Sequence, residues 1–293
     1  MQVDLLTKVI LPLSLFFIMF GIGISLKPVD FKNIIKFPKA VAIGIFAQMI
    51  LLPMIAFTIA VILNLPAEIA VGLIIIALAP GGVTSNMYSY LFKGDVSLSV
   101  SLTVLVSFIT PLTMPLIAVL SMKYFMGSHT DFSLPVVKTS IQLLLITIVP
   151  VILGMLFLWR WQKLAKRIET LLKWFSIIIL FLIIALITLK NADNITGFFA
   201  QAGLATLLLN LISLILGYQL AKLSKLSQAQ AITIGFEVGI QNGTLALVVA
   251  GTLIGNNIMM IPTITYSLIM FASGALFGWW LRTYAQAGKA SED

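Results

Sequence analysis

The chain alternates between long apolar runs and short polar segments. Nine of the runs are close to the ~20 residues that a helix needs to cross a bilayer core. Each run is bounded by charged residues or by proline and glycine, which interrupt helices. The pattern therefore predicts an all-α polytopic membrane protein with nine transmembrane helices. The predicted spans are residues 5–26, 38–63, 67–92, 96–121, 134–158, 166–189, 200–222, 227–254 and 260–284.

The first apolar run has some features of a secretory leader, because Lys8 precedes it. However, Val9–Leu26 is long enough to span a bilayer, and Asp4 disrupts a basic leader. No cleavage signal of small residues follows the run. We therefore interpret this segment as a retained transmembrane helix.

Two of the predicted spans are interrupted near their middles. The third contains Pro80, Gly81 and Gly82, and the eighth breaks around Gly239–Gly243. Proline removes a backbone donor and glycine lowers the steric barrier to unwinding, so both helices should break there. Alternating topology makes the two spans run in opposite directions. Paired broken helices of opposed direction are typical of transporters built from inverted repeats.

The order of the spans fits such a repeat. Spans two to four pair with spans seven to nine, which places one interrupted helix in the middle of each set. The first span then pairs with the sixth, and the fifth has no partner. Direct similarity between the halves is weak, so this prediction depends on spacing and on the two breaks.

Composition supports a membrane protein and limits its chemistry. The chain has 293 residues, of which 60% are hydrophobic and 10% charged, whereas soluble domains carry about 25% charged residues. The absence of cysteine excludes disulfides and thiolate chemistry. The single histidine, His129, lies in a polar loop, where we expect it to be solvated, and cannot form a metal site alone.

The distribution of basic residues predicts the orientation of the chain. A net charge of +8 can indicate a nucleic-acid partner, but here the basic residues are dispersed between apolar runs. If the loop after the first span is cytoplasmic, fourteen of the 18 basic residues fall inside. The positive-inside rule thus places the N-terminus outside and the C-terminus in the cytoplasm. The four outside residues are Lys8, Lys123, Lys138 and Lys190.

One acidic residue is predicted to lie deep in a span. Glu237 belongs to the segment GFEVGIQNG, Gly235–Gly243, whereas Glu68 begins the third span at its outer edge. A carboxylate at this depth costs several kcal/mol unless something pairs with it or binds it. One interpretation is a kinked helix with a protonated, hydrogen-bonded glutamate. The other is a cation site.

Oxygen-bearing side chains near the first break favour the cation site. Hard cations take several oxygen ligands at once. Ser99 and Thr103 are four residues apart and therefore lie on one helix face, whereas we interpret Ser101 and Ser107 as hydroxyls that bond their own helix backbone. The candidate ligands near this break are Ser85, Asn86, Ser99 and Thr103.

The second break offers Gln241 and the freed carbonyls of residues 238–240. Gln48 is the one strongly polar side chain in the second span, either as a ligand or as an interhelical hydrogen-bonding group. Without soft ligands an alkali cation is favoured over a transition metal. Sodium is favoured over calcium, because one carboxylate balances a dication poorly.

The breaks also create helix N-termini near Thr84 and Asn242. Their free amide groups and positive dipole ends favour an anion such as a carboxylate or sulfonate. No lysine or arginine is predicted at mid-depth to take that role. The residues therefore predict an organic anion carried together with sodium.

Several motifs resemble those of the bile acid:sodium symporter family, including its bacterial members that carry bile acids or small carboxylates such as pantoate. The resemblance covers nearly the whole chain in collinear order. The motifs are LKPVDF (26–31), FPKAVAIGIFAQ (37–48), APGGVTSN (79–86), Lys93-Gly94-Asp95 followed by SLSVSLT (97–103), and EVGIQN (237–242).

The resemblance implies a panel domain of residues 1–36 and 130–195 (helices 1, 5 and 6). It implies a core domain of residues 37–129 and 196–293 (helices 2–4 and 7–9), in which the two discontinuous helices cross. It also implies two sodium ions as coupling ions and a bacterial inner membrane location. The first sodium site would be formed by Ser85, Asn86, Ser99, Thr103 and Glu237. The second would be formed by Gln48, Glu237, Gln241 and the carbonyls of Val238 and Ile240.

The chain departs from this family at a few positions. It lacks the first helix of the ten-helix bacterial members and so is similar to the nine-helix animal members. Val83 stands where threonine is common, and Met270-Phe271 where a His-Asn pair is common. Both changes remove polar groups and favour a larger or more apolar anion over pantoate. The polar substrate contacts that remain are Thr84, Asn86, Asn242 and Ser267.

The combined prediction is a secondary active transporter that couples sodium symport to an organic anion by alternating access. We expect no enzymatic activity, no cofactor, no nucleic acid and no obligate protein partner. The main alternative is a proton-coupled transporter or sodium/proton antiporter that uses Glu237, although such proteins usually have acidic pairs or a lysine partner. A membrane enzyme lacks its catalytic residues here. A channel or receptor remains a further alternative.

Overall fold

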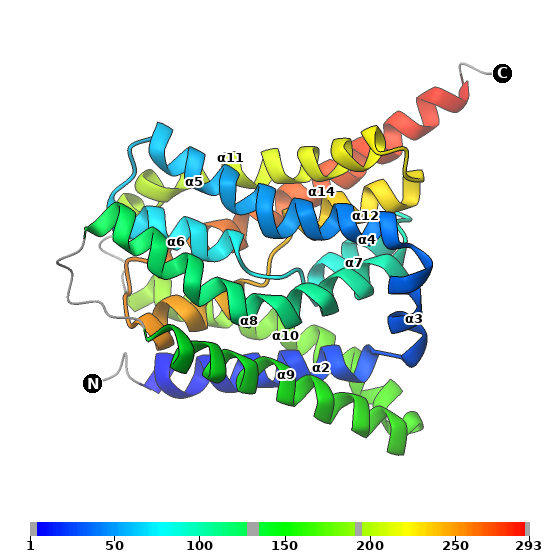
Figure 1. Ribbon diagram of the computed structural model, residues 1–293, viewed down its shortest axis with the longest axis horizontal. Helices are drawn as coiled ribbons and strands as arrows, with labels where there is room; N and C mark the ends of the chain where they lie inside the picture. Colours follow the sequence, from blue (N-terminus) through cyan, green and yellow to red (C-terminus); the bar gives the residue numbers. More distant parts are fainter. Residues whose placement is uncertain (1–4, 128–134, 191–194, 291–293) are drawn as a thin grey trace.

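The computed structural model describes residues 5–127, 135–190 and 195–290 (Figure 1). Helices and their connections make up these residues, and no strand occurs among them. His129 lies outside the described residues. The elements, with η for π-helical turns, are η1 (Leu6–Ile10), α2 (Leu11–Ser25), α3 (Pro28–Lys36), α4 (Pro38–Phe46), η2 (Ala47–Leu51), α5 (Leu52–Ile62), α6 (Ala67–Ala77), α7 (Val83–Leu91), α8 (Val96–Met126), α9 (Val136–Arg160), α10 (Gln162–Lys190), α11 (Ile195–Leu223), α12 (Gln228–Gly239), α13 (Gly243–Leu247), η4 (Val248–Ile254) and α14 (Met260–Ala290).

Eight helical segments within the described ranges are long and apolar enough to cross a membrane. The predicted third span is not among them, because it is divided into α6 and α7 on either side of residues 78–82. Each piece is shorter than the ~20 residues that a bilayer core requires. The helical class is therefore confirmed, whereas the count of nine spans stays a prediction.

The connection between the first two predicted spans forms the short helix α3. The Asp30 carboxylate accepts a hydrogen bond from the Lys27 backbone N–H at 2.8 Å. Proline occupies the first helical position, where no N–H is needed. Ser101 Oγ on α8 lies 3.0 Å from the Asp30 carbonyl oxygen, so α3 packs against the bundle.

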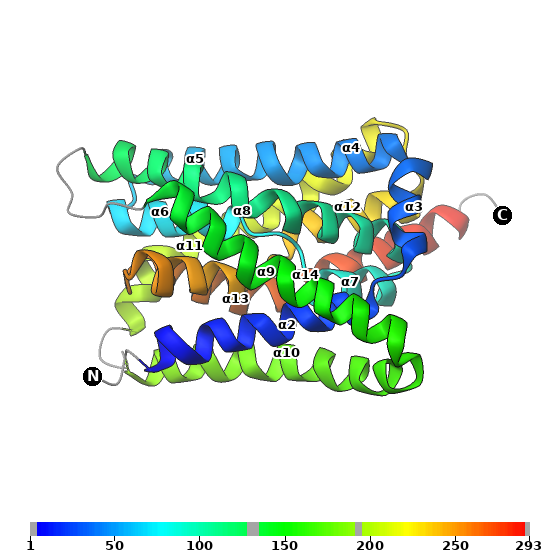
Figure 2. The same ribbon diagram turned by 60° about the horizontal axis from the view of Figure 1, so that its bottom comes forward.

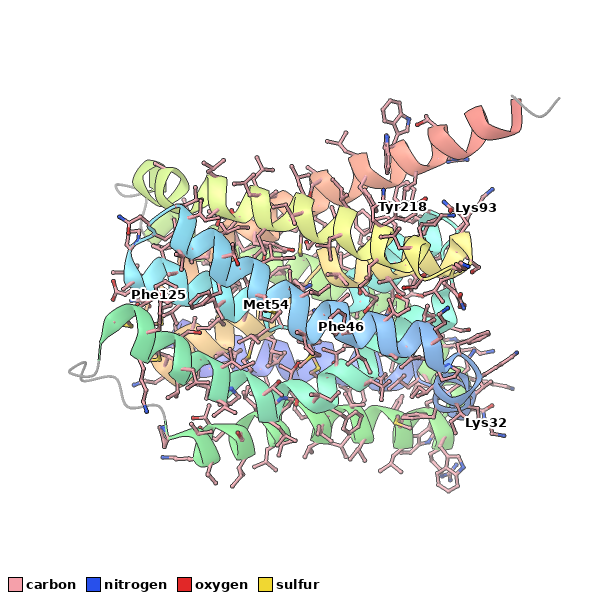
Figure 3. The ribbon with its side chains drawn as sticks, turned by 45° about the horizontal axis from the view of Figure 1, so that its top comes forward. Lys32, Phe46, Met54, Lys93, Phe125 and Tyr218 are labelled. Atoms are coloured by element: carbon pink, nitrogen blue, oxygen red, sulfur yellow. The ribbon has the colours of Figure 1, made fainter. Side chains whose placement is uncertain are left out.

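The helices lie roughly along the long axis of the molecule and form layers (Figure 2). Helices α2, α9 and α10 pack together on one side, and α4 and α5 lie on the opposite side (Figure 2). The described N-terminal residues lie at one end, and α3 lies at the other end together with the C-terminal part of α14 (Figure 1). Lys32 and Lys93 share the end that holds α3, and Phe125 lies at the opposite end (Figure 3). This arrangement agrees with helices that cross in alternation.

The second interrupted segment and the first half of the other, α6, are the most buried parts of the bundle. The apolar 18-residue stretch within Gln228–Ile254 is buried in full, and all residues of α6 from Ile69 onward are buried. By contrast, only 28% of the corresponding apolar stretch within Val136–Arg160 is buried. The outer helices therefore present the surface that suits lipid, and the polar groups at the breaks are kept away from it.

Candidate functional site

The site lies where the two helix breaks meet. One break comprises residues 78–82 between α6 and α7, and the other comprises residues 240–242 between α12 and α13. The backbone N–H of Asn242 donates to the Pro80 carbonyl at 2.8 Å, so the breaks contact each other directly. Both interruptions are thus present where proline and glycine predict them.

Local hydrogen bonds stabilise the new helix ends. The Gly82 N–H, at the N-cap of α7, donates to Ser85 Oγ at 2.9 Å. Asn242 is the N-cap of α13, and its Oδ1 accepts from the Leu245 N–H at 3.0 Å. These bonds satisfy donors that would otherwise be unpaired inside the membrane.

Glu237 is 3% exposed and is surrounded by hydroxyl groups. Ser85 on α7 and Ser99 on α8 donate to its Oε1 at 2.7 and 2.6 Å. Thr103, one turn after Ser99, donates to Oε2 at 2.8 Å. Asn86 Oδ1 lies 2.7 Å from Ser99 Oγ. The structure therefore brings together all five residues predicted for the first sodium site.

This cluster contains more oxygen atoms than hydrogen atoms to share between them. The Ser99 hydroxyl has one hydrogen, yet its Oγ lies 2.6 Å from Glu237 Oε1 and 2.7 Å from Asn86 Oδ1. Thr103 Oγ1 likewise lies 2.8 Å from the carboxylate and 3.4 Å from Asn86 Oδ1. Several oxygen lone pairs therefore converge around the carboxylate without a hydrogen to share, and such oxygens are the ligands that a hard cation binds.

Three groups predicted for the second sodium site also meet: Gln48, Gln241 and the Val238 carbonyl. Gln48 Nε2 donates to Gln241 Oε1 at 2.7 Å and to the Ala79 carbonyl at 2.8 Å. Gln241 Nε2 donates to the Val238 carbonyl at 2.7 Å. Ile240, with extended backbone, lies between Val238 and Gln241 in the chain. Gln48 therefore makes interhelical hydrogen bonds, one of the two roles predicted for it. Its position beside Gln241 is also the one that the other role, as a cation ligand, requires.

A second polar cluster was not predicted from the sequence. Asn210 Nδ2 on α11 and the Tyr266 hydroxyl on α14 both donate to the Gly239 carbonyl, at 2.7 and 2.8 Å. Ser273 donates to Asn210 Oδ1. Asn210 is an amide within an apolar run, which is the same signal that distinguishes Gln48. Nothing in the pattern around Tyr266 indicates where its hydroxyl points.

A cavity of about 500 Å³ opens beside the first break. Val83, Asn86 and Tyr90 line it from α7, and Leu172 lines it from α10. Other walls come from α2 and the start of α8. Its charged lining residues, all at the α3 end of the molecule, are Lys27, Asp30 and Glu169. Apart from Val83 and Asn86, these lining residues were not predicted, because sequence periodicity does not show how α2 and α10 lie beside α7.

The four predicted substrate residues occupy different places. Asn86 lines the cavity, whereas Thr84, Asn242 and Ser267 lie outside its described lining. Asn242 Nδ2 and Ser267 Oγ are buried and have no hydrogen-bond partner among the described residues. Ser267 lies against the start of α13, since a β-carbon at Gly243 would contact its Oγ.

Two further expectations about individual side chains are tested. Ser101 Oγ donates to the Ser97 carbonyl at 2.7 Å, which confirms its back-bonding role. The same prediction is wrong for Ser107, whose buried Oγ has no partner within the described residues. Back-bonding is one rotamer option for a helical serine, and spacing alone does not select it.

The Met270-Phe271 pair does not line the cavity as the structure describes it. Met270 is 1% exposed within the core. The Phe271 ring packs 5.1 Å from Phe181 of α10, and its carbonyl accepts a hydrogen bond from the Tyr88 hydroxyl at 2.6 Å. Phe271 therefore forms a contact between α10 and α14, and neither residue of the pair is part of the described cavity lining.

Comparison with known proteins shows the family to which the chain belongs. The family model described as the sodium bile acid symporter family matches residues 12–198. An uncharacterized sodium-dependent transporter of Bacillus subtilis is 32% identical over 285 residues, 94% of this chain and 85% of the relative. The chain belongs to the sodium bile acid symporter family. It is therefore a multi-pass membrane protein of a family of sodium-dependent transporters, which are not enzymes.

Further relatives come from plants and animals. A probable chloroplastic sodium/metabolite cotransporter of Arabidopsis thaliana is 29% identical, over 94% of this chain and 67% of the relative. The human hepatic sodium/bile acid cotransporter is 29% identical, over 82% of this chain and 68% of the relative. The family model ends before Glu237. The second break is therefore included in the candidate site because of its contacts with the first, such as the hydrogen bond from Ser85 to Glu237.

Proposed function

We propose that the protein is a secondary active transporter that moves an organic anion together with two sodium ions by alternating access. Asn86 is the residue on which this proposal rests, because it belongs to both the candidate first sodium site and the candidate substrate cavity. It lines the cavity, and its Oδ1 lies 2.7 Å from Ser99 Oγ beside Glu237. A cation bound at Glu237 would draw Oδ1 inward and turn Nδ2 toward an anion in the cavity.

The first sodium ion would bind among the oxygens around Glu237. Its charge would balance the buried carboxylate, and the serine and threonine hydroxyls would turn their hydrogens away to present lone pairs. Glu237 comes from the second interrupted helix and Ser85 from the first. Sodium bound here would thus hold the two breaks together.

The second sodium ion would bind near the two glutamines and the carbonyls of Val238 and Ile240. In the present arrangement the Gln48 amide nitrogen faces Ala79 and Gln241. Rotation of that amide about its last bond exchanges Nε2 and Oε1, which converts a donor into a ligand. The same hydrogen-bonded pair can therefore supply oxygen to a cation.

The chemistry of the cavity suits an amphipathic anion. Val83 and Leu172 provide apolar wall, Tyr90 provides an aromatic surface, and Asn86 lies in the first turn of α7. A helix N-terminus favours negative charge, and 500 Å³ is in the range of pockets for small organic ligands. The bile acids named for the hepatic relative have this character. Asn242 and Ser267 would join the substrate site in another conformation, because both hold unsatisfied polar atoms beside the second break.

The transport cycle would follow from an inverted repeat of nine spans. Helices α4–α8 and α11–α14 would form the core, and α2, α9 and α10 would form the panel. With the N-terminus outside, the cavity at the α3 end faces the cytoplasm, and movement of the core against the panel would expose the site on the other side. Because sodium and substrate favour the same arrangement of Asn86, each should raise the affinity of the other.

Uptake into proteoliposomes tests this function. We expect an inward sodium gradient to accumulate labelled taurocholate or a related amphipathic anion, with little uptake in potassium. Two sodium ions per monovalent anion would make uptake sensitive to membrane potential. Counterflow of labelled substrate would distinguish a carrier from a channel or receptor. Uptake that follows a proton gradient without sodium would contradict the proposal and favour proton coupling at Glu237.

A further inference from the structure

The carbonyl of Gly239, at the end of α12, is held by two side chains. Asn210 Nδ2 and the Tyr266 hydroxyl donate to it from α11 and α14, at 2.7 and 2.8 Å. Both donors are 0% exposed. A carbonyl freed by a helix break inside a membrane requires such partners, because an unpaired one costs several kcal/mol.

Asn210 is itself fixed by its surroundings. Ser273 donates to Asn210 Oδ1, and Ser213 donates to the Asn210 backbone carbonyl at 2.8 Å. Leu214, one turn after Asn210, lies so close that a β-carbon at Gly239 would contact its side chain. Buried polar networks with every member paired are rigid. Helix α11 therefore holds the end of α12 in one position.

The position of this carbonyl restricts its neighbours. Peptide units are planar, and neighbouring units are joined at an α-carbon by only two rotatable bonds. Fixing the unit between Gly239 and Ile240 therefore limits the rotation of the units on both sides. One of these carries the Val238 carbonyl, which meets Gln241 Nε2 at 2.7 Å. The other carries the Ile240 carbonyl. These are the two carbonyls assigned above to the second sodium site.

We propose that Asn210 and Tyr266 are positioning residues for the second sodium site. They do not touch the ion. They hold Gly239 on the side of α11 and α14, so that the carbonyls of Val238 and Ile240 stay available beside Gln48 and Gln241. This inference depends on the proposed sodium coupling, and it assigns part of the sodium affinity and selectivity to residues outside the ligand set.

Replacement of Tyr266 by phenylalanine tests the proposal most cleanly, because it removes one oxygen and keeps the ring. We expect Tyr266→Phe to raise the sodium concentration for half-maximal uptake about tenfold, as loss of one buried hydrogen bond does. The maximal rate at saturating sodium should stay near that of the unchanged protein. The ratio of lithium-driven to sodium-driven uptake should rise, because loosened carbonyls can close around a smaller ion.

Asn210→Leu should give a larger shift in the same direction, and Thr206→Ala is the matched control. Thr206 is a fully buried hydroxyl one turn before Asn210 that bonds the Ala202 carbonyl of its own helix at 2.8 Å. The control should change neither the sodium half-saturation nor the lithium ratio. If Asn210→Leu does not fold, Tyr266→Phe alone decides the question.

The outcomes separate the two proposals. Sodium-independent uptake by the unchanged protein would overturn the proposed function and this inference with it. Sodium-dependent uptake with unchanged half-saturation and unchanged lithium ratio in Tyr266→Phe would overturn only the positioning role. A lower melting temperature with those two quantities unchanged would also overturn it, because that result describes a purely structural hydrogen bond.

Discussion

The two helix breaks are built alike and contribute different chemistry. At each break a side-chain amide donates to the carbonyl that precedes the turn, from Gln48 to Ala79 at 2.8 Å and from Asn210 to Gly239 at 2.7 Å. The amides lie 31 and 29 residues before those carbonyls, as expected if the breaks belong to repeats. The first break, however, supplies neutral hydroxyls and an amide, whereas the second supplies the carboxylate of Glu237.

The amides also differ in what else they reach. Gln48 extends to Gln241 of the other break at 2.7 Å, whereas the Asn210 oxygen is occupied by Ser273 on α14. One amide therefore joins the two breaks and the other fixes a single break. Each break alone supplies only part of the proposed cation site, so an ion bound there would have to bridge the two breaks.

The largest effect should come from removing the charge that only the second break supplies. Glu237→Gln keeps the size of the side chain but leaves the ring of oxygens without a negative charge. Loss of one charge from a buried pair is worth about 3 kcal/mol, or about a hundredfold in sodium affinity. Sodium-driven uptake should therefore be nearly abolished.

Glu68→Gln is the control for that change. Glu68 lies at the start of α6 and accepts a hydrogen bond from Asn256 at 2.8 Å, which glutamine can still accept. Its uptake should stay within about twofold of the unchanged protein, as for most surface substitutions. Full sodium-driven uptake in Glu237→Gln would remove the carboxylate from the mechanism.

The next effect tests how closely the first break approaches the carboxylate. A β-carbon at Gly81 would contact Glu237 Oε2 and Ser85 Oγ, whereas one at Gly82 would lie 3.9 Å from Asn242. Overpacking costs about 2 kcal/mol, so Gly81→Ala should weaken sodium activation about thirtyfold. Gly82→Ala, with extended backbone, should weaken it far less. Equal effects of the two neighbouring substitutions on sodium half-saturation would show that the close approach is unimportant.

A smaller effect should come from one hydroxyl that contacts both breaks. Ser99→Ala removes the group between Asn86 and Glu237 and should raise the sodium half-saturation about tenfold, as for a hydrogen bond to a charged group. Ser101→Ala, on another face of α8, is the matched control because Ser101 bonds Ser97 and α3. Sodium titrations of uptake that give the same shift for both serines would contradict the assignment.

The smallest effect should appear in the substrate preference. Val83 lines the cavity at the start of α7, and Val83→Thr adds one hydroxyl with little change in volume. We expect affinity for a small hydroxylated carboxylate such as pantoate to rise about threefold, and affinity for taurocholate to fall slightly. Competition assays at fixed sodium would measure this ratio, and an unchanged ratio would place Val83 outside the substrate site.

The sequence predicts much of the first candidate site, because its signals are local. Proline and glycine determine the breaks, and the four-residue spacing of Ser99 and Thr103 places both on one helix face toward Glu237. The deep carboxylate is visible because it is rare among apolar residues.

The rest depends on tertiary packing that no local pattern reports. Tyr266 reaches Gly239 from the last helix, and an isolated tyrosine in an apolar helix has no period to show its direction. Lys27 and Leu172 become cavity walls only when the connection between α2 and α3, and helix α10, lie beside α7. Ser107 shows the converse, since a residue type that usually bonds its own helix does not do so here.

Sodium-dependent stability of the purified protein tests the central claim most directly. A ligand that binds only the folded state stabilises it by about 2.7 kcal/mol at a hundred times its dissociation constant. The melting temperature of the unchanged protein should therefore rise with sodium at constant ionic strength, with potassium as the replacement ion, and Glu237→Gln should show no such rise. Equal sodium stabilisation of both proteins would contradict a cation site between the two breaks.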